Sequence, residues 1–291
     1  MELSRLLEQK LGGHWQVEPS GGSDAYRFYR AASASACLFL KVGRESAHLA
    51  AEREGLLALQ AAAAPVPQVY GLWEMADEHV LALNFLAFQH RSAEDWGRLG
   101  SVLARLHTPA WPQFGWRQNN FLGATPQCNT PTPGASAADW LAFFQQQRLA
   151  PMLEKLGPSL QAAEQELFTR LLANLPAILD GHAPRTSLTH GDLWAGNWGV
   201  DVDGAVWLFD PAVAVADREM DLAMLELFST PPATFWQAYR SLAQPDFDPQ
   251  GYARRRPLYQ LYHLLNHWLL FGRSYAGQAV AACRAALSGG G

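Results

Sequence analysis

The pattern of hydrophobic and polar positions changes character about a third of the way along the chain. Up to residue 86, short β-type runs and two helical patterns (about 3–11 and 47–60) predict strands at about 15–17, 26–29, 37–42, 69–73 and 79–85. From Ala93 onward a helical period dominates and predicts helices at about 93–107, 137–153, 160–179, 253–271 and 274–287. Strand-like residues return at 188–213. The pattern therefore predicts an α+β chain with two lobes.

The two lobes are expected to differ in size and content. Residues 1–86 are predicted to form a small lobe, in which an antiparallel sheet carries one main helix, and residues 87–291 a larger helical lobe. The stretch 111–133 is rich in proline and is predicted to be a long ordered loop or a functional insertion. A turn at 201–204 is predicted to join two short strands as a hairpin.

Composition narrows the classes of partner. The chain has 291 residues, 49% of them hydrophobic, which is enough for a buried core, and its net charge is −5. That charge argues against binding to nucleic acid or to an anionic membrane surface. The charged N-terminal stretch is unlike a signal peptide, and no apolar run approaches the roughly 18 residues of a membrane span. Three widely spaced cysteines form no disulfide framework, so we expect a reducing, cytoplasmic location.

The sharpest chemical signal is the run His190-Gly191-Asp192-Leu193-Trp194-Ala195-Gly196-Asn197. Phosphoryl transfer needs a carboxylate beside the attacking hydroxyl and ligands for magnesium, and the catalytic loop of kinases supplies an Asp followed five residues later by an Asn. Asp192 and Asn197 have that separation. Further on, an apolar strand at 206–209 ends in Asp210, which fits the second metal-binding carboxylate. The spacing predicts Asp192 as the catalytic base and Asn197 and Asp210 as magnesium ligands. The alternative is a capped turn followed by a buried Asp.

A lysine in the first lobe is a candidate for binding the phosphates of ATP. Lys41 ends an apolar strand, where its side chain can bridge the α- and β-phosphates, although a lysine at a strand end is also a common surface residue. The helix that follows offers Glu52 or Glu54 as its partner, and Glu52 is preferred.

Two other segments of the first lobe are candidates for contacting the nucleotide. Gly21 and Gly22 lie between two strands, where their backbone N–H groups can approach phosphates, but an ordinary hairpin turn fits them equally well. Asn84, Phe85 and Leu86 follow a strand and precede the helical lobe. They are predicted to form a hinge whose backbone binds adenine, with a plain interdomain link as the alternative.

With these residues in place, the sequence resembles the fructosamine kinase family, within the aminoglycoside phosphotransferase and choline kinase superfamily. The resemblance covers nearly the whole chain and is carried by the segments FGWRQNNFLGATPQCN (114–129), DWLAFFQQQRL (139–149), LTHGDLWAGN (188–197), FDPAVAVADREMDLAMLELF (209–228) and LYQLYHLLNHWLLFGRSY (258–275). Trp194, directly after Asp-Leu, separates this family from choline and aminoglycoside kinases.

The resemblance implies a protein-kinase-like two-lobe fold and phosphorylation of the sugar 3-hydroxyl of ketosamines, with ATP and Mg²⁺ as cofactors. The substrates would be ribulosamine or fructosamine adducts, free or protein-bound. The unstable 3-phosphate would then release the adduct in a deglycation repair. Bacterial members often favour ribulosamines. By position, Asp192 would be the base, Asn197 and Asp210 the metal ligands, Lys41 the phosphate-binding lysine and Glu52 its partner. Asp221 would brace the catalytic loop.

The family pattern is not matched everywhere. Ala195 stands where Ser is common, Trp198 where a small aliphatic residue is usual, and Asp217 where His is frequent. These changes remove no predicted ligand, but they leave the choice of substrate open. Four side chains are candidates for an aromatic wall against a sugar, with core packing as the alternative: Trp194, Trp198, His267 and Trp268.

Two rival functions remain at this point. The chain could be a kinase for another small hydroxyl substrate, such as choline, homoserine or an aminoglycoside, or a nucleotide-binding pseudokinase that serves as a scaffold. The presence of all three polar catalytic residues argues against the pseudokinase. The sequence does not indicate the oligomeric state.

Overall fold

The computed structural model describes residues 2–243 and 247–289. The chain folds as two compact units. The first consists of residues 1–91 and 198–211, and the second of residues 92–197 and 212–291. The chain thus enters the first unit a second time, just after the predicted catalytic loop. The predicted lobe boundary between residues 86 and 87 stays a prediction.

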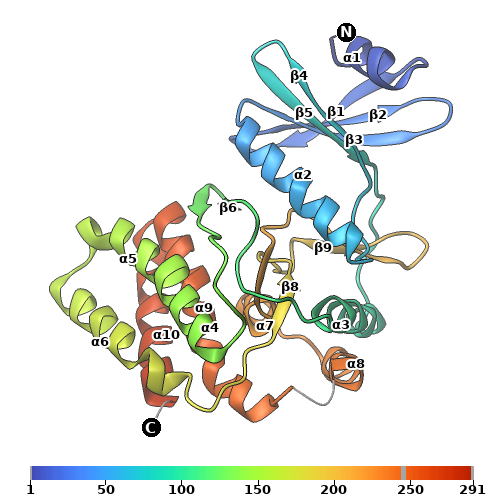
Figure 1. Cartoon of the computed structure of the whole chain (residues 1–291). Coiled ribbons are helices and arrows are strands. Elements are labelled where there is room, and N and C mark those ends of the chain that lie inside the picture. Colours follow the sequence, from blue (N-terminus) through green and yellow to red (C-terminus); the bar gives the residue numbers. More distant parts are fainter. Residues whose placement is uncertain (1, 244–246, 290–291) are drawn as a thin grey trace. The chain divides into compact units, whose positions relative to one another are not determined.

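A sheet is the centre of the first unit (Figure 1). Among the described residues its five antiparallel strands have the order β1-β2-β3-β5-β4, with bounds β1 Gln16–Gly22, β2 Arg27–Ala32, β3 Cys37–Gly43, β4 Val69–Met75 and β5 Glu78–Asn84. Helix α1 (Glu2–Leu11) buries Leu3, Leu6 and Leu7 in the same core as the alternating side chains of β3, as their helical spacing predicts. Helix α2 (Ser46–Ala61) packs on β4 and β5.

A short hairpin completes the first unit. Strands β9 (Trp198–Val200) and β10 (Val206–Leu208) pair antiparallel through the predicted turn at 201–204. The Leu208 N–H donates to the Pro65 carbonyl at 2.8 Å, and the Gln89 N–H to the Val200 carbonyl at 2.9 Å. These bonds tie the hairpin to the sheet side of the chain. They carry Phe209 and Asp210 into the first unit.

The second unit is mainly helical. Its helices are α3 (Ala93–His107), α4 (Ala137–Phe144), α5 (Ala150–Leu156), α6 (Ala162–Ile178), α7 (Glu219–Leu227), α8 (Ala233–Ala243), α9 (Pro249–Phe271) and α10 (Ala276–Gly289), with short 3₁₀ turns at Gly157–Ser159 and Arg273–Tyr275. Helices α3 and α4 both begin with a capping box, Ser92 with Asp95 and Ser136 with Asp139, which satisfies the first N–H groups. Helix α9 packs between α10, α5 and α7 (Figure 1).

In the described part of the second unit, two strand pairs lie among these helices. Strands β8 (Thr186–Thr189) and β11 (Ala214–Asp217) pair antiparallel and hold the two ends of the segment that visits the first unit. Strands β6 (Asn120–Leu122) and β7 (Thr125–Gln127) form a hairpin within the proline-rich stretch, which was predicted as a long loop. Three-residue strands are too short to leave an alternating pattern, so the sequence did not reveal them.

The fold class is confirmed as α+β, with an antiparallel N-terminal sheet and a helical C-terminal region. Helix α3 has the predicted bounds, whereas the helix predicted at 137–153 is divided by a π-helical turn, Gln145–Leu149. Helix α8 was not predicted at all. Among the described residues, no helix is both long enough and apolar enough to span a membrane.

Candidate active site

The first unit contains a cavity of about 400 Å³ that opens beside the sheet. Its walls are mostly aromatic and aliphatic, and its charged groups lie in contact with one another. The lining residues are Ser20, Phe28, Phe39, Lys41, Glu52, Pro67, Leu83, Asn84, Phe85, Leu86, Phe88, Phe209 and Asp210. A cavity of this size with apolar walls and a few converging polar groups is typical of a small-ligand site. Six of the predicted site residues meet here.

Lys41 is the cation of this cavity, and it bridges two carboxylates. Its Nζ donates to Glu52 Oε2 at 2.7 Å and to Asp210 Oδ1 at 3.1 Å. The Tyr26 ring lies beside it, with the Nζ atom 4.8 Å from the ring centroid. The predicted Lys41–Glu52 pair is therefore present, and its role towards a nucleotide stays a prediction.

The electrostatics of the trio follow from its burial. Burial raises the pKa of the Glu52 carboxyl group, the neighbouring Asp210 carboxylate raises it further, and Lys41 opposes both effects. Burial also works against the charge of Lys41, but Glu52 and Asp210 outweigh it, so that the pKa of Lys41 is raised and the ammonium persists. Asp210 has a half-exposed side chain and a left-handed backbone, with φ at 54°. Left-handed Asp residues are uncommon, and such strain concentrates at functional sites.

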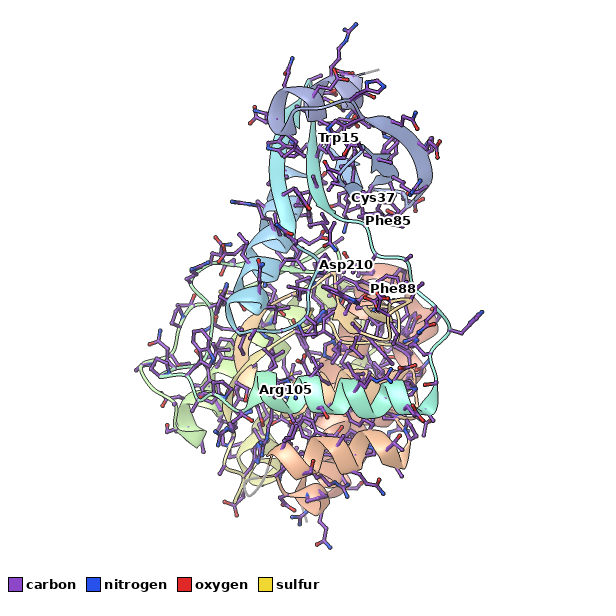
Figure 2. All side chains as sticks on the ribbon, turned by 90° about the vertical axis from the view of Figure 1, so that its right-hand side faces the viewer. Trp15, Cys37, Phe85, Phe88, Arg105 and Asp210 are labelled. Carbon is purple, nitrogen blue, oxygen red and sulfur yellow. The ribbon has the colours of Figure 1, made fainter. Side chains whose placement is uncertain are left out.

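The segment after β5 forms one side of the cavity. The Asn84 N–H donates to the Gln68 carbonyl at 3.0 Å, and the Phe85 N–H to the Cys37 carbonyl at 2.9 Å. Figure 2 shows Phe85 next to Cys37, with Phe88 further along the chain. Two of the three predicted hinge residues thus use their N–H groups within the sheet, and Leu86 is the nearest donor along the chain for a base.

Gly21 and Gly22 lie at the end of β1 rather than in an open loop. Gly21 has φ at 133°, and a β-bulge separates it from Pro19. A Cβ atom on Gly22 would come within 2.8 Å of the Tyr26 carbonyl oxygen, so the turn from β1 to β2 requires glycine there. Neither glycine is among the residues that line the cavity, whereas Ser20 is. Their predicted role towards phosphates stays a prediction.

The predicted catalytic loop lies in the second unit, after β8. The Asn197 Nδ2 donates to the Asp192 backbone oxygen at 2.8 Å and to Asp192 Oδ2 at 3.2 Å. The Asp192 N–H in turn contacts His190 Nδ1 at 3.3 Å. Asp192 is partly exposed and Asn197 is buried. With its nitrogen turned to Asp192, Asn197 has its side-chain oxygen as the atom for a metal.

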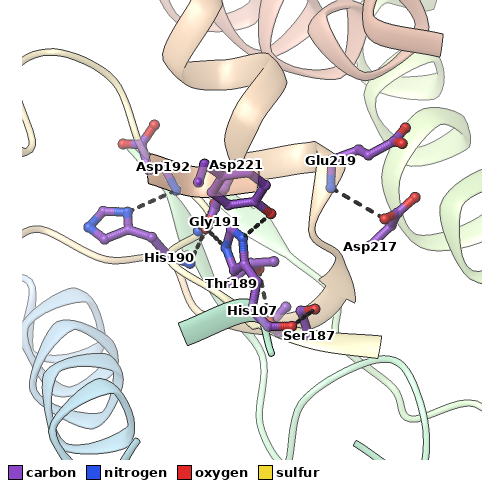
Figure 3. Close-up of polar contacts among 11 residues, drawn as sticks. His107, Ser187, Thr189, His190, Gly191, Asp192, Asp217, Glu219 and Asp221 are labelled. Atoms are coloured by element: carbon purple, nitrogen blue, oxygen red, sulfur yellow. Dashed lines mark hydrogen bonds and ion pairs between the residues drawn. The ribbon is translucent and has the colours of Figure 1, made fainter. Parts of the chain in front are cut away.

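Asp221, at the start of α7, binds the backbone of this loop through its carboxylate (Figure 3). Its Oδ2 accepts the His190 N–H at 2.7 Å, its Oδ1 accepts the Gly191 N–H at 2.8 Å, and His107 Nε2 lies 3.1 Å from Oδ2. Burial acts to raise the pKa of Asp221, but the hydrogen bonds and charges of His107 and His190 outweigh it and lower the pKa. The predicted brace is therefore present. His107 packs as expected, and its ring links Asp221 to Tyr239.

A comparison with models of protein families identifies the family of this chain. A family model described as fructosamine kinase matches residues 1–288. The chain belongs to the fructosamine kinase family.

Relatives in sequence and in structure agree with the family. The chain is 37% identical over 237 residues to a protein of Synechocystis assigned as a ketoamine kinase, covering 78% of this chain and 73% of the relative. A crystal structure of a protein assigned as a fructosamine-3-kinase from Thermobifida fusca superposes with a TM-score of 0.86 at 30% identity, over 98% of each chain. The aminoglycoside phosphotransferase APH(4)-Ia, in complex with AMP-PNP and hygromycin B, shares only the fold, with a TM-score of 0.67 at 14% identity over 100% of this chain and 99% of that one. The protein is thus an ATP-dependent kinase with a protein-kinase-like fold.

A second acidic cluster in this kinase has metal-ligand residue types. Ligand atoms of His182, Asp217 and Glu219 lie within 4.8 Å of one another. However, Arg255 binds both oxygens of Glu219, at 2.9 and 2.7 Å, and Asp217 accepts from Tyr259 at 2.7 Å and bonds to His182. The carboxylate oxygens are therefore already used by protein donors. Asp217, the departure from the family pattern, is an internal anchor for the start of α7.

The four candidates for an aromatic wall differ in exposure, and for Trp194 and His267 the hypothesis stays a prediction. Trp198 and Trp268 are each 2% exposed and pack in cores, so for these two the wall hypothesis is wrong. Trp194, in contrast, is 41% exposed, and its ring lies so close to Gly196 that a Cβ there would overlap it at 2.3 Å. His267 belongs to a partly exposed ring cluster with Phe228, Phe271 and Tyr275.

Sequence reasoning missed the aromatic walls of the cavity. Phe28 and Phe39 lie on adjacent strands with ring centroids 5.3 Å apart, and Phe209 lies 5.2 Å from Phe88. The alternation along β2 and β3 places Phe28, Phe39 and Lys41 on one face. The alternation along these two strands was therefore a sequence signal for Phe28 and Phe39. Phe88 and Phe209 come together only through the hairpin of β9 and β10.

Proposed function

We propose that the kinase transfers the γ-phosphoryl group of ATP to the sugar 3-hydroxyl of ketosamines, in a deglycation repair. The family and the relatives assigned as ketoamine kinases support the substrate class. The observation that carries the proposal is the Asp192–Asn197 pair on a loop whose backbone is held by Asp221. A preference for ribulosamines and a cytoplasmic location remain predictions.

ATP is proposed to bind in the cavity of the first unit. Its adenine would pack among Phe28, Phe39 and Phe209, and the Leu86 N–H would be the donor for the base. Lys41 would exchange its bond to Asp210 for the phosphates and keep Glu52 as its partner. The raised pKa of Lys41 keeps it charged for that task.

Asn197 and Asp210 are the residues proposed to hold Mg²⁺. Their side-chain oxygens are the hard ligands that this ion prefers, and the half-exposed Asp210 carboxylate borders the cavity. When bound, Mg²⁺ would neutralise charge on the β- and γ-phosphates.

Asp192 is proposed to act as the base. It would accept the proton of the 3-hydroxyl as the sugar oxygen bonds to the γ-phosphorus and ADP leaves with the electrons of the broken P–O bond. The brace from Asp221 removes the freedom of the loop before the substrate arrives, so the carboxylate needs little reorganisation. The exposed face of Trp194, two residues along, is a surface on which the sugar can stack.

Acceptor assays test this proposal. ATP consumption is measured with ribulose-lysine, fructose-lysine, choline, homoserine and an aminoglycoside, for the wild type and for Asp192→Ala. We expect turnover with the ketosamines and a loss of at least about 10³-fold in Asp192→Ala. The matched control, Asp180→Ala at an exposed position just after α6, should keep wild-type turnover. Turnover with choline or an aminoglycoside alone would reject the substrate class, and an undiminished Asp192→Ala would reject the base.

A further inference from the structure

A chain of buried amides crosses the second unit from the π-helical turn to the segment after Asp210. Arg148 Nη2 donates to Asn129 Oδ1 at 2.6 Å, and Asn129 Nδ2 donates to Asn120 Oδ1 at 2.8 Å. Asn120 Nδ2 then donates to the Val213 backbone oxygen at 2.8 Å. We call Arg148, Asn129 and Asn120 the amide relay. Its members are 2%, 0% and 5% exposed.

The two ends of the relay determine the direction of every bond in it. A guanidinium group only donates, so Asn129 must present its oxygen to Arg148 and its nitrogen to Asn120. A backbone carbonyl only accepts, so Asn120 must present its nitrogen to Val213. A flip of either amide would oppose two donors or two acceptors. The relay therefore has one arrangement.

A side branch strengthens the same hub. Gln127 Nε2 donates to Asn120 Oδ1 at 2.8 Å, and its Oε1 accepts the Tyr262 hydroxyl at 2.6 Å. Asn120 Oδ1 thus receives two N–H groups, which fill both of its acceptor positions. Tyr262 comes from the middle of α9, so the hub joins the β6–β7 hairpin to that helix.

Burying the charge of Arg148 costs free energy, because its partners among the described residues are neutral. It donates to the carbonyls of Cys128 and Gln147 and to Asn129, and its guanidinium stacks on the rings of Phe143 and Tyr262 at 4.5 and 5.9 Å. Burial lowers the pKa of Arg148. The π-helical turn breaks the α-helical period, and such turns often lie at functional sites.

The other end of the relay reaches the wall behind the catalytic loop. Ala212 directly precedes Val213 in the chain, and its N–H donates to the His190 carbonyl at 2.8 Å. Gly191 has φ at 84°, and a Cβ atom there would lie 2.0 Å from the Ala212 oxygen. The loop backbone next to Asp192 therefore rests on Ala212, so a displacement of Val213 is transmitted to it.

From this geometry we propose that Asn120 is a positioning residue for phosphoryl transfer. Asn120 fixes the Val213 carbonyl, the adjoining Ala212 holds the backbone of His190 and Gly191, and Arg148 determines the orientation of the amides. The loop is thereby held on two sides, by Asp221 and by the relay. This inference rests on the proposed function for the reaction that the loop performs.

The variant Asn120→Asp tests the relay at its last bond. It keeps the size and the acceptor for Gln127 and Asn129, but places a carboxylate oxygen against the Val213 carbonyl. We expect kcat with a ketosamine at pH 8 to fall about 10- to 100-fold while the KM for ATP changes less than about threefold. Hydrogen exchange should accelerate in peptides covering 189–193 and 211–214.

Thr132→Val is the matched control. Thr132 is 8% exposed in the same insertion, and its hydroxyl oxygen accepts the Phe114 N–H at 2.9 Å and donates to the Gly134 carbonyl at 2.6 Å. The Thr132→Val substitution should lower the stability of the fold about as much as Asn120→Asp does. It should leave both kcat and the hydrogen exchange at 189–193 unchanged. A second pair, Arg148→Met with Arg148→Lys, attacks the other end. The lysine, which still donates, should restore part of the kcat that methionine loses.

The outcomes separate this inference from the proposed function. Wild-type kcat and exchange in Asn120→Asp would overturn the positioning role, as would an equal loss of kcat in Thr132→Val. If Asn120→Asp does not fold, the Arg148 pair decides, and a lysine no better than methionine overturns the proposal. Lack of ketosamine turnover in the wild type would reject the proposed function, and the exchange comparison would still decide on the relay.

Discussion

Two aspartates of the predicted site, Asp210 and Asp221, have opposite environments. In the first unit, Asp210 has a half-exposed side chain, a left-handed backbone and a bridge to Lys41 at 3.1 Å. In the second unit, Asp221 has no exposed side-chain surface, and two backbone N–H groups and one imidazole contact its oxygens. Both are aspartates close in sequence.

This difference separates exchangeable contacts from permanent ones. A half-exposed carboxylate such as Asp210 can exchange its lysine partner for a cation, because solvent reaches the carboxylate and offsets part of the lost contact. A buried carboxylate with three donors loses all of them if it moves, which costs several kcal/mol. We therefore expect substitution of Asp210 to affect activity with little effect on stability, and substitution of Asp221 to affect both.

The largest effect is expected for Asp210→Asn. The change keeps the shape and tolerates the left-handed backbone, but removes the negative charge proposed for Mg²⁺. ATP-dependent turnover should fall at least about 10³-fold, and the melting temperature should change by less than about 2 °C. Turnover assays and thermal melts of the same preparation measure both. Turnover within about tenfold of the wild type would mean that Asp210 is no metal ligand.

Asp221→Asn is expected to come next. In either orientation the NH₂ group of an Asn side chain faces a backbone N–H, that of His190 or that of Gly191, which leaves two donors facing one another in a buried site. The free energy of unfolding should fall by about 3 kcal/mol, and kcat should fall with it. Urea denaturation measures the first quantity. Asp180→Asn, on an exposed position, is the control. A variant as stable as this control would contradict the brace.

The smallest effect concerns the buried His182–Asp217 pair. Burial acts to lower the pKa of His182, but the Asp217 carboxylate and its hydrogen bond outweigh it, so the pKa of His182 is raised. Burial acts to raise the pKa of Asp217, but His182 and Tyr259 outweigh it, so the pKa of Asp217 is lowered. The raised pKa of His182 stabilises the folded state at low pH, and this stabilisation is lost as the pH rises through the pKa of His182 in the folded state. The lowered pKa of Asp217 stabilises the folded state at a pH above its unfolded-state pKa, and this stabilisation is lost as the pH falls through the pKa of Asp217 in the folded state.

His182→Gln should therefore cost more near pH 6 than near pH 9. At pH 6 we expect a loss of about 1–2 kcal/mol in the free energy of unfolding, and a smaller loss at pH 9, because the stabilisation from the raised His182 pKa declines as the pH rises. Urea denaturation at both pH values provides the numbers. His14→Gln, which removes an exposed His14–Glu8 contact, should show little cost at either pH. An equal cost for His182→Gln at both pH values would refute the charged pair.

Sequence patterns predicted the elements whose residues lie close together in the chain. The bounds of α3 follow from its cap and its buried stripe, and the hairpin of β4 and β5 from its turn, in which Ala76 has φ at 54°. Asp192 and Asn197 were found because five residues of one loop suffice to bring them together. The helix at 137–153 was predicted without its π-helical turn, since one inserted residue barely changes the hydrophobic period.

By itself, the sequence determined the fold class and the family, and it predicted the catalytic loop, because these depend on local periodicity and on short spacings. Only the tertiary structure decided that Asp217 bonds to His182, 35 residues away, and that Asn120 holds Val213, 93 residues away. Such contacts depend on how α7, α9 and the β6–β7 hairpin pack. The residues next to a side chain in the sequence do not indicate a contact partner that lies on a distant element. The structure thus shows buried contacts of Asp217 and Asn120, two polar residues that the sequence pattern marked only as members of family segments.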